Sequence, residues 1–330
     1  MAATTVSSSR WNGTSDHRAR PAPHTGRGSR LRILLDATLW NRIGECHEEQ
    51  AFEALEGSFS LETVLAPSVL LEVLESPAPE LRDRAVHAMT NLRRTCLPTE
   101  ASQCAEEFVN EAARLRPGWL RSFPLTDRLA PLENFWSKRV WVNARRDSAA
   151  GHLAVAKRER KRSESSEGAG FLDRFAGEEP DAIEAWRLDS AARYWNELGL
   201  LGAGEAADPG LEVTLRHWVS PWVSIEQVRR DRADFDAFWY DEVDRSQMVR
   251  NWIFSCCDGP ERSHLTHLPD TDVLLTGELG LAAAGKALRG AAPSWLPPTL
   301  HVPHLPGGVV AGIESVLKSD HELRGRLPRS

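Results

Sequence analysis

Two short apolar segments near opposite ends of the 330-residue chain each end in an acidic residue. The first is LRILL at 31–35, followed by Asp36, and the second is VLLT at 273–276, followed by Gly277 and Glu278. Apolar runs of this length bounded by polar residues are typical of buried parallel strands. The carboxyl ends of such strands share one crevice in an open α/β sheet. The pattern therefore predicts an α/β fold with a central parallel sheet that brings Asp36 and Glu278 together.

Two carboxylates in one crevice repel each other unless a cation lies between them. Carboxylate oxygens are the ligands that Mg²⁺ and Mn²⁺ prefer, so the crevice is predicted to hold one of these metals. Glu72, in the helical run after a second apolar segment at 64–67, and Asp258, 20 positions before Glu278, can join the same crevice. Asp272 opens the last segment and is expected as a further ligand nearer the rim. Such a cluster suits in-line hydrolysis of a phosphodiester.

Composition and periodicity divide the chain into five parts. They are a disordered N-terminal tail (1–29), the first part of an α/β domain (30–116), a helical insertion rich in Trp (117–250), the second α/β part (251–317) and a C-terminal tail (318–330). Within these parts, helices are expected near 45–57, 80–95 and 100–115, and a last strand near 299–302.

Charge and cysteine content exclude several classes of protein. The net charge of −7 argues against non-specific wrapping of nucleic acid, although a local basic face can still bind it. Five cysteines without C-x-x-C spacing indicate neither a zinc site nor a disulfide framework. The chain has no run of about 20 apolar residues and no apolar signal-peptide core, so we expect a cytoplasmic protein without a membrane partner.

The acidic segments resemble those of PIN-domain nucleases. RILLDATLW is similar to the opening strand of that family, with Thr38 in the place of a Thr, Ser or Asn that follows the Asp. APSVLLEVL is similar to its second acidic element, and the stretch from Asp258 through DTDVLLTGELGLA resembles its closing segment, which includes Thr276. The resemblance implies a Rossmann-like three-layer sandwich and metal-dependent cleavage of RNA, as in nucleases of toxin or defence type.

By that resemblance, Asp36, Glu72, Asp258 and Glu278 bind the metal or act in catalysis. Thr38 orients Asp36 or the attacking water, and Thr276 supports the site. The chain departs from the family in having Glu278 where an Asp is usual, and in the 185 residues between Glu72 and Asp258. These departures keep open a catalytically silent PIN-like scaffold that binds through its Trp-rich insertion. A phosphohydrolase acting on a small substrate is a third hypothesis.

Each acid also has a structural interpretation. Glu72 is typical of a solvated helix surface, Asp36 of a helix cap, and Glu278 of the first turn of a helix. Asp270 and Asp272 suit a turn before a strand. His264 and His267 are expected at the edge of the crevice as ordinary polar residues, with proton transfer as the alternative.

A basic run at 157–162 is the candidate contact for an RNA backbone. It contains five cations, Lys157, Arg158, Arg160, Lys161 and Arg162. Trp136 and Trp141 upstream can stack on unpaired bases, whereas Phe238, Trp239 and Tyr240 are expected to pack the insertion itself. A solvated charged segment is the alternative interpretation of the run. The sequence leaves open a homo-oligomer or a protein partner.

Overall fold

The computed structural model describes residues 30–91, 94–163, 191, 194–196, 198, 215–244, 247–256, 264–291 and 295–324. The described chain forms a five-stranded sheet of order β3-β2-β1-β4-β5, and every neighbouring pair is parallel. The strands are β1 (Leu31–Leu35), β2 (Leu61–Leu65), β3 (Thr95–Cys96), β4 (Val273–Thr276) and β5 (Thr299–His301). The predicted α/β fold with a central parallel sheet is confirmed, and it is consistent with a Rossmann-like sandwich.

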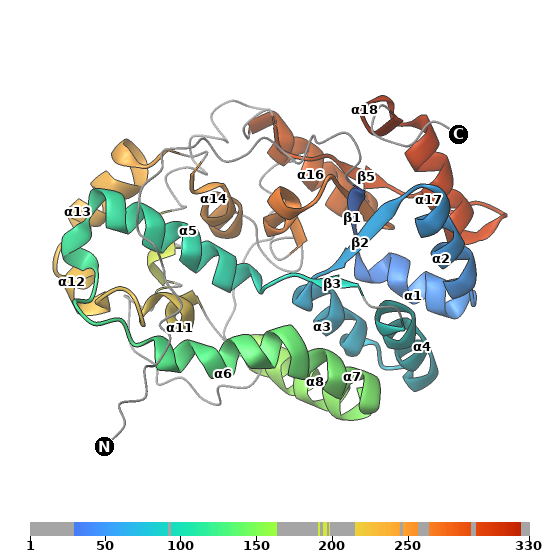
Figure 1. The fold of residues 1–330 in the computed structure, drawn as a ribbon, viewed down its shortest axis with the longest axis horizontal. Coiled ribbons are helices and arrows are strands. Elements are labelled where there is room, and N and C mark those ends of the chain that lie inside the picture. Colours follow the sequence, from blue (N-terminus) through green and yellow to red (C-terminus); the bar gives the residue numbers. More distant parts are fainter. Residues whose placement is uncertain are drawn as a thin grey trace, which may run out of the picture.

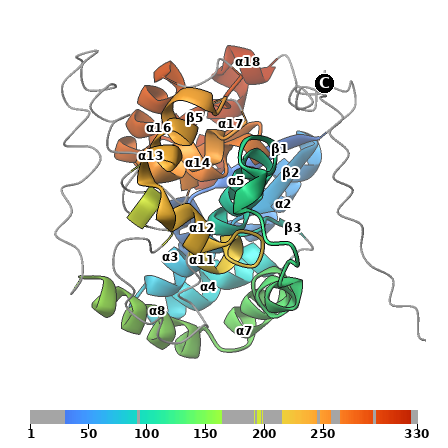
Figure 2. The ribbon, with the colours of Figure 1, turned by 90° about the vertical axis from the view of Figure 1, so that its left-hand side faces the viewer.

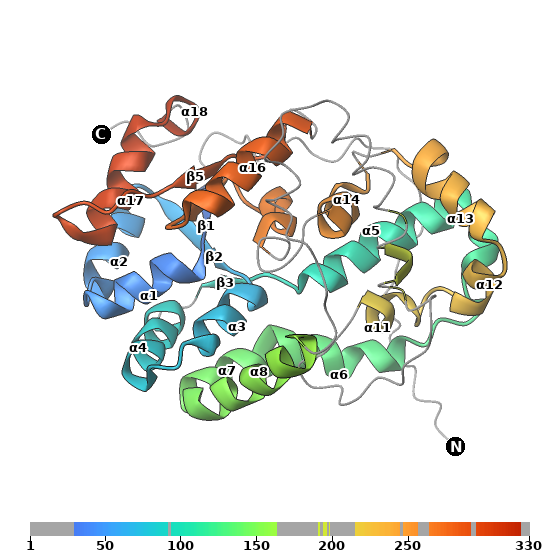
Figure 3. The same cartoon turned by 180° about the vertical axis from the view of Figure 1, so that it is seen from behind.

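Helices cover both faces of this sheet (Figure 1). Those on one side are α1 (Ala37–Glu45), α2 (Glu49–Ser58), α4 (Pro79–Thr90) and α17 (Gly308–Ser319). Those on the other side are α5 (Glu100–Leu115), α14 (Val249–Cys256) and α16 (Leu279–Ala291), which Figure 3 shows from behind. Helix α3 (Pro67–Glu75) follows β2 directly. Because helices cover both faces, the central strands are buried on both and consist of continuous apolar runs.

The helix predicted at 45–57 is observed as α2, which begins four residues later, at Glu49, and ends at Ser58. Helix α1, which precedes it, was not predicted. Asp36 caps α1, since its Oδ1 accepts a hydrogen bond from the Leu39 N–H at 2.8 Å. The chain turns at His47, which has a positive φ of 55°, before α2 begins. The helix predicted near 100–115 is confirmed by α5, and the strand predicted near 299–302 is confirmed by β5. The strand predicted near 64–67 is observed as β2, which lies three residues earlier and ends at Leu65, because Pro67 begins α3.

The described middle of the chain is mostly helical, with turns and one isolated bridge between Leu120 and Val223. It includes α6 (Leu129–Asn134), α7 (Val140–Arg146), α8 (Ser148–Ser163), α11 (Leu215–Val219), α12 (Ile225–Arg230) and α13 (Arg232–Ala237). Helices α7 and α8 pack on α4, and α8 also packs on α3. Helices α11 and α14 pack on α5. Figure 2 shows α11, α12 and α13 gathered at one end of the molecule.

Aromatic residues form the core of this helical part. Phe238 is fully buried, with its ring 5.1 Å from that of Trp119 and 5.7 Å from that of Phe108. Trp239 lies 4.5 Å from the ring of Tyr194. The prediction that residues 238–240 pack the insertion itself is thus confirmed for Phe238 and Trp239. Trp136 and Trp141 are buried as well, so the hypothesis that they stack on bases is wrong.

The end of the described chain is more ordered than predicted. Helix α17 continues to Ser319, and α18 (His321–Arg324) places Leu323 in the core, so the expectation of a tail from 318 is wrong for residues 318–324. The predicted N-terminal tail and residues 325–330 lie outside the described residues. None of the described helices is both long and apolar enough to cross a bilayer.

Candidate active site

The strand order reverses between β1 and β4, and two of the acids predicted from the sequence, Asp36 and Glu278, lie at this point. The connection from β1 leads to β2 on one side, and that from β4 leads to β5 on the other. In open α/β sheets, ligands bind in the crevice outside the carboxyl ends of the strands at such a switch point. Asp36 follows β1 there, and Thr276, Gly277 and Glu278 end β4 and lead into α16.

The Asp36 carboxylate joins the ends of β1 and β4. Its Oδ2 accepts a hydrogen bond from the Thr276 hydroxyl at 2.5 Å and from the Gly277 N–H at 3.0 Å. Its Oδ1 caps α1. The sequence predicted a catalytic role and a capping role as alternatives. The capping role is observed. The buried position at the switch point is compatible with a catalytic role of Asp36 as well.

A second hydrogen bond, nearer the surface, also joins the segment after β1 to the segment after β4. The Thr38 hydroxyl donates to Oε1 of the exposed Glu278 at 2.8 Å. The two chain segments approach closely here, since a Cβ added at Gly277 would lie 2.7 Å from Cγ2 of Thr38. A glycine is therefore required at 277 by this contact. The contact keeps Glu278 over the crevice.

Burial makes the charge on Asp36 costly. The side chain is 2% exposed, and this desolvation raises the pKa of Asp36 from 3.8 to about 6. The hydrogen bonds from Thr276, Leu39 and Gly277 and the charge of His264 act in the opposite direction and only partly offset it. A carboxylate with this balance gains much from an added cation.

Glu72 and His264 form the second half of the site. Nε2 of the buried His264, in a helical turn at 264–266, lies 2.7 Å from Oε2 of Glu72 on α3. The two atoms are at ion-pair distance, and Glu72 is the charged neighbour that acts most strongly on His264. His264 also interacts electrostatically with Asp36 and with Glu100, the first residue of α5. It therefore connects acids that follow three different strands.

The charge state of His264 follows from these neighbours. Burial alone would lower the pKa of His264, but Glu72, Asp36 and Glu100 outweigh it, so the pKa of His264 is raised above its usual value. The imidazolium is thus favoured, and its positive charge acts on both Glu72 and Asp36. The expectation that His264 and His267 lie at the edge of the crevice is wrong, because both are buried.

Several other predicted site residues are not in this group. Asp272 lies at the amino end of β4, where its Oδ2 accepts a hydrogen bond from the Arg32 N–H at 2.8 Å. Asp272 and Asp36 thus lie at opposite ends of the paired strands β4 and β1. The expectation that Asp272 is a ligand near the crevice rim is not supported. Asp258 lies outside the described residues. Lys157 is exposed on α8, and the side chains of Arg158, Arg160, Lys161 and Arg162 lie outside the described part of the chain.

The chemistry of the donor set fits a divalent metal in part. Asp36, Glu72 and Glu278 are hard oxygen donors, but Oε2 of Glu72 already has the His264 imidazole as a neighbour at 2.7 Å. Within the described residues, no three His, Cys, Asp or Glu side chains lie close enough to form a metal centre. A complete centre would need movement of these side chains or a ligand such as Asp258 from outside the described residues.

Comparisons of the chain with protein-family models, with curated proteins and with solved structures found no match. The function of the site is therefore inferred from its own geometry at the switch point.

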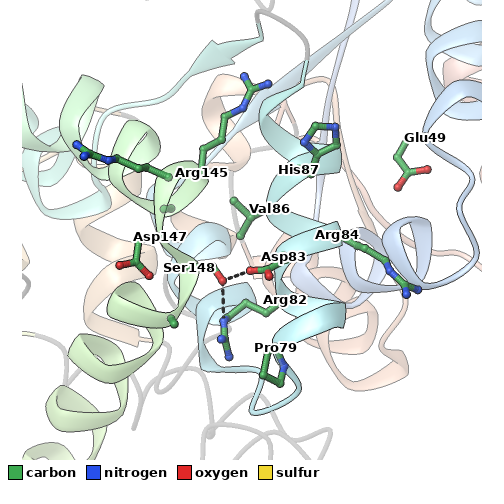
Figure 4. A pocket seen from close by; sticks show the side chains of 13 residues that line it. Glu49, Pro79, Arg82, Asp83, Arg84, Val86, His87, Arg145, Asp147 and Ser148 are labelled. Atoms are coloured by element: carbon green, nitrogen blue, oxygen red, sulfur yellow. Dashed lines mark hydrogen bonds between the residues drawn. The ribbon is translucent and has the colours of Figure 1, made fainter.

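A separate hollow of about 520 Å³ lies between α4 and the junction of α7 with α8 (Figure 4). Ser148 at the start of α8 donates to Asp83 and accepts from Nε of the buried Arg82 at 3.1 Å, and both partners are on α4. Arginines and acids alternate on its walls, which include Arg84, Arg145 and Asp147 as well. These contacts fasten the insertion to the sheet domain, and we assign the hollow a structural role.

Two features of the site were not predicted from the sequence, namely Glu100 and the central place of His264. Glu100 follows the two-residue strand β3 and the cap Thr99, so the pattern of a strand followed by an acid was present. The strand is too short to be recognised from its apolar residues. His264 has no strand of its own, and only the fold places it beside Glu72.

Proposed function

We propose that the chain is a metal-dependent nuclease of PIN-like type that hydrolyses phosphodiester bonds in RNA. The observation that carries the proposal is the meeting of Asp36 and Glu278 at the switch point of a parallel sheet, with Glu72 linked to Asp36 through His264. The order of strands and acids supports the resemblance seen in the sequence. A three-layer PIN-like sandwich is part of this proposal.

Asp36, Glu72 and Glu278 are the residues that would hold Mg²⁺ or Mn²⁺. A bound divalent cation lowers the pKa of a water molecule and neutralises the phosphodiester as charge develops on it. Thr276 and Gly277 fix the orientation of the Asp36 carboxylate. Thr38 fixes that of Glu278. Glu72 is held by His264 on its inner side, and its 28% exposure leaves it accessible from the crevice.

The test is cleavage of RNA by the purified full chain with Mn²⁺ or Mg²⁺. Asp36→Asn keeps the capping oxygen and removes the charge, and we expect it to lower the cleavage rate about 100-fold or more. Asp127→Asn is the matched control, because Asp127 is exposed in a short turn away from the sheet. An unchanged rate in Asp36→Asn, with a folded variant, would remove the nuclease assignment.

A silent PIN-like binding module is the second candidate, and one observation favours it. The positive charge of the His264 imidazolium already acts on both Glu72 and Asp36, which is the task that the acidic pattern of the sequence predicted for a metal. Calorimetric titration with Mn²⁺ separates the two candidates. The nuclease predicts binding that Asp36→Asn weakens, whereas the binding module predicts no heat of Mn²⁺ binding in either protein.

A further inference from the structure

Arg42 lies at the rim of the candidate active site. It is four residues after Thr38 on α1, so the two side chains are on the same face of the helix. A Cβ added at Gly277 would lie 3.5 Å from Cζ of Arg42. The guanidinium is therefore next to the turn that connects Thr276, which bonds Asp36, with Glu278.

This guanidinium is half-buried and has no carboxylate of its own. Within the part of the chain that the structure describes, it donates no hydrogen bond and forms no ion pair. The neighbouring Glu278 carboxylate is bonded to Thr38 instead. Other arginines of this domain are engaged, as Arg94 is with Glu56 at 2.9 Å and Arg82 is with Ser148 at 3.1 Å. The N–H donors of the Arg42 guanidinium are thus available to a ligand that binds beside the turn.

The class of ligand follows from the charge and shape of Arg42. The planar guanidinium presents paired N–H donors that match the oxygens of a phosphate, and it stays protonated at any working pH. The acids near it are the buried Asp36 and the exposed Glu278, whose negative charge would repel a polyanion. A cation at the rim offsets that repulsion where the substrate chain leaves the site.

An exposed apolar residue that follows the same turn narrows the class of ligand further. Leu279, which follows Glu278 at the start of α16, is 72% exposed and belongs to the few large apolar side chains with such exposure in the described chain. A phosphate gains nothing from contact with an apolar surface, whereas an unpaired nucleobase can pack against one. A cation and an exposed Leu at one rim therefore fit a nucleotide unit better than a free phosphate.

We propose that Arg42 binds a backbone phosphate of a single-stranded RNA next to the bond at the carboxylates, with Leu279 in contact with the adjacent base. The proposal rests on the proposed nuclease function and names the substrate form that the site accepts. Arg42 is a substrate-binding residue, and it takes no part in proton transfer.

Binding and cleavage are measured separately to test this. Binding of a fluorescent single-stranded RNA oligonucleotide to the full chain is followed by anisotropy in EDTA over a series of salt concentrations. We expect Arg42→Gln to weaken binding about fivefold and to reduce the slope of log affinity against log salt by about 0.7, the value for one contact to a single strand. Arg42→Lys is expected to restore the slope but only part of the affinity, because Lys keeps the charge and loses the paired donors.

Arg128→Gln is the matched control, since Arg128 is exposed in a short turn of the insertion. In the presence of Mn²⁺, Arg42→Gln is expected to raise KM and leave kcat nearly unchanged. Leu279→Ser is expected to weaken binding of the oligonucleotide without changing the salt slope. Melting followed by circular dichroism shows that each variant is folded.

The outcomes separate this proposal from the nuclease function. A wild-type protein that cleaves RNA, with the same salt slope and KM in Arg42→Gln, overturns the role of Arg42 and leaves the nuclease standing. A wild-type protein that binds through Arg42 but cleaves with neither metal overturns the nuclease and supports phosphate binding by Arg42. Equal loss of binding in Arg42→Gln and Arg128→Gln, or no binding to wild type, also overturns the role of Arg42.

Discussion

At the scale of single residues, Asp36 combines a structural task with a chemical one. It caps α1 and bonds the turn after β4, so three groups hold one carboxylate in place. The same enclosure makes its ionisation costly, as the pKa of about 6 records. A residue fixed in this way is preorganised, and its charge is available to whatever cation reaches the crevice.

A pH-dependent stability follows from this enclosure. Because the pKa of Asp36 is raised on folding, its contribution to stability is fully present below pH 3.8 and is lost as the pH rises through about 6. The loss amounts to about 3 kcal/mol. Asp36→Asn lacks this titration, so the free energy of unfolding of the variant minus that of wild type should increase by most of that amount between pH 4 and pH 7. Urea unfolding in EDTA measures it.

A difference that stays constant over this pH range would show that the burial of Asp36 does not control its ionisation. Asp127→Asn again serves as the control. Its carboxylate is exposed, so we expect the substitution to change the free energy of unfolding by less than about 0.5 kcal/mol.

Sequence patterns at this scale identified Asp36, Thr38, Thr276 and Glu278, because each belongs to or follows a strand that is recognisable from its apolar residues. The same patterns placed Asp272 near the site, although it stands at the other end of its strand. They gave no role to Arg42. Its place beside Gly277 depends on how closely α1 approaches the turn after β4, which no local pattern encodes.

At the scale of elements, the contact between α16 and β5 depends on a glycine. A Cβ at Gly285 would overlap the side chain of Thr299, so the helix axis can approach the strand only because residue 285 has no side chain. The required closeness is a property of the packed pair, and no local sequence pattern encodes it.

Gly285→Ala should therefore lower the free energy of unfolding by about 1–3 kcal/mol through overpacking. Gly290→Ala, in the same helix, is the control. A Cβ there meets nothing within 4 Å, and this substitution should be neutral or stabilising by up to about 1 kcal/mol. Chemical denaturation of the two variants checks the prediction. Equal effects would mean that α16 can move away from β5 at little cost.

At the scale of the whole molecule, a buried charge network joins the helical insertion to the sheet domain. Arg250 on α14 is 4% exposed and lies 3.1 Å from Glu107 on α5. It also forms a bidentate pair, at 2.5 and 2.6 Å, with Asp270 just before β4. The segment from Thr266 to Asp270, which follows His264, is thus held by a residue of the insertion.

The insertion was predicted from its lack of strands. Its attachment to the sheet domain was not predicted, since the sequence around a single Arg in a helix does not indicate that the Arg is buried.

Arg250→Met should destabilise the protein by about 3–5 kcal/mol at neutral pH, because Glu107 and Asp270 remain buried without their cation. Burial raises the pKa of Asp270, but His267 and Arg250 outweigh it and lower the pKa below its usual value. Stability from Asp270 is therefore present above pH 3.8 and is lost as the pH falls further, so the effect of Arg250→Met should shrink in acid. Arg229→Met, which removes an exposed pair with Glu226, should cost less than about 1 kcal/mol.

Thermal melts of both variants at pH 3 and pH 7 measure these differences. A cost of Arg250→Met that is the same at both values would show that the buried acids are not the source of the effect.

The pairing of β1 with β4 also has a consequence for the growing chain. Asp36 and Thr276 are 240 positions apart, so β1 lacks its neighbour on that side until most of the polypeptide has left the ribosome. Until then the strand presents a row of unsatisfied amide groups, which is a template for association between nascent copies. Synthesis of such a protein is safest where chaperones shield that edge, and prematurely terminated products are the species most prone to aggregate.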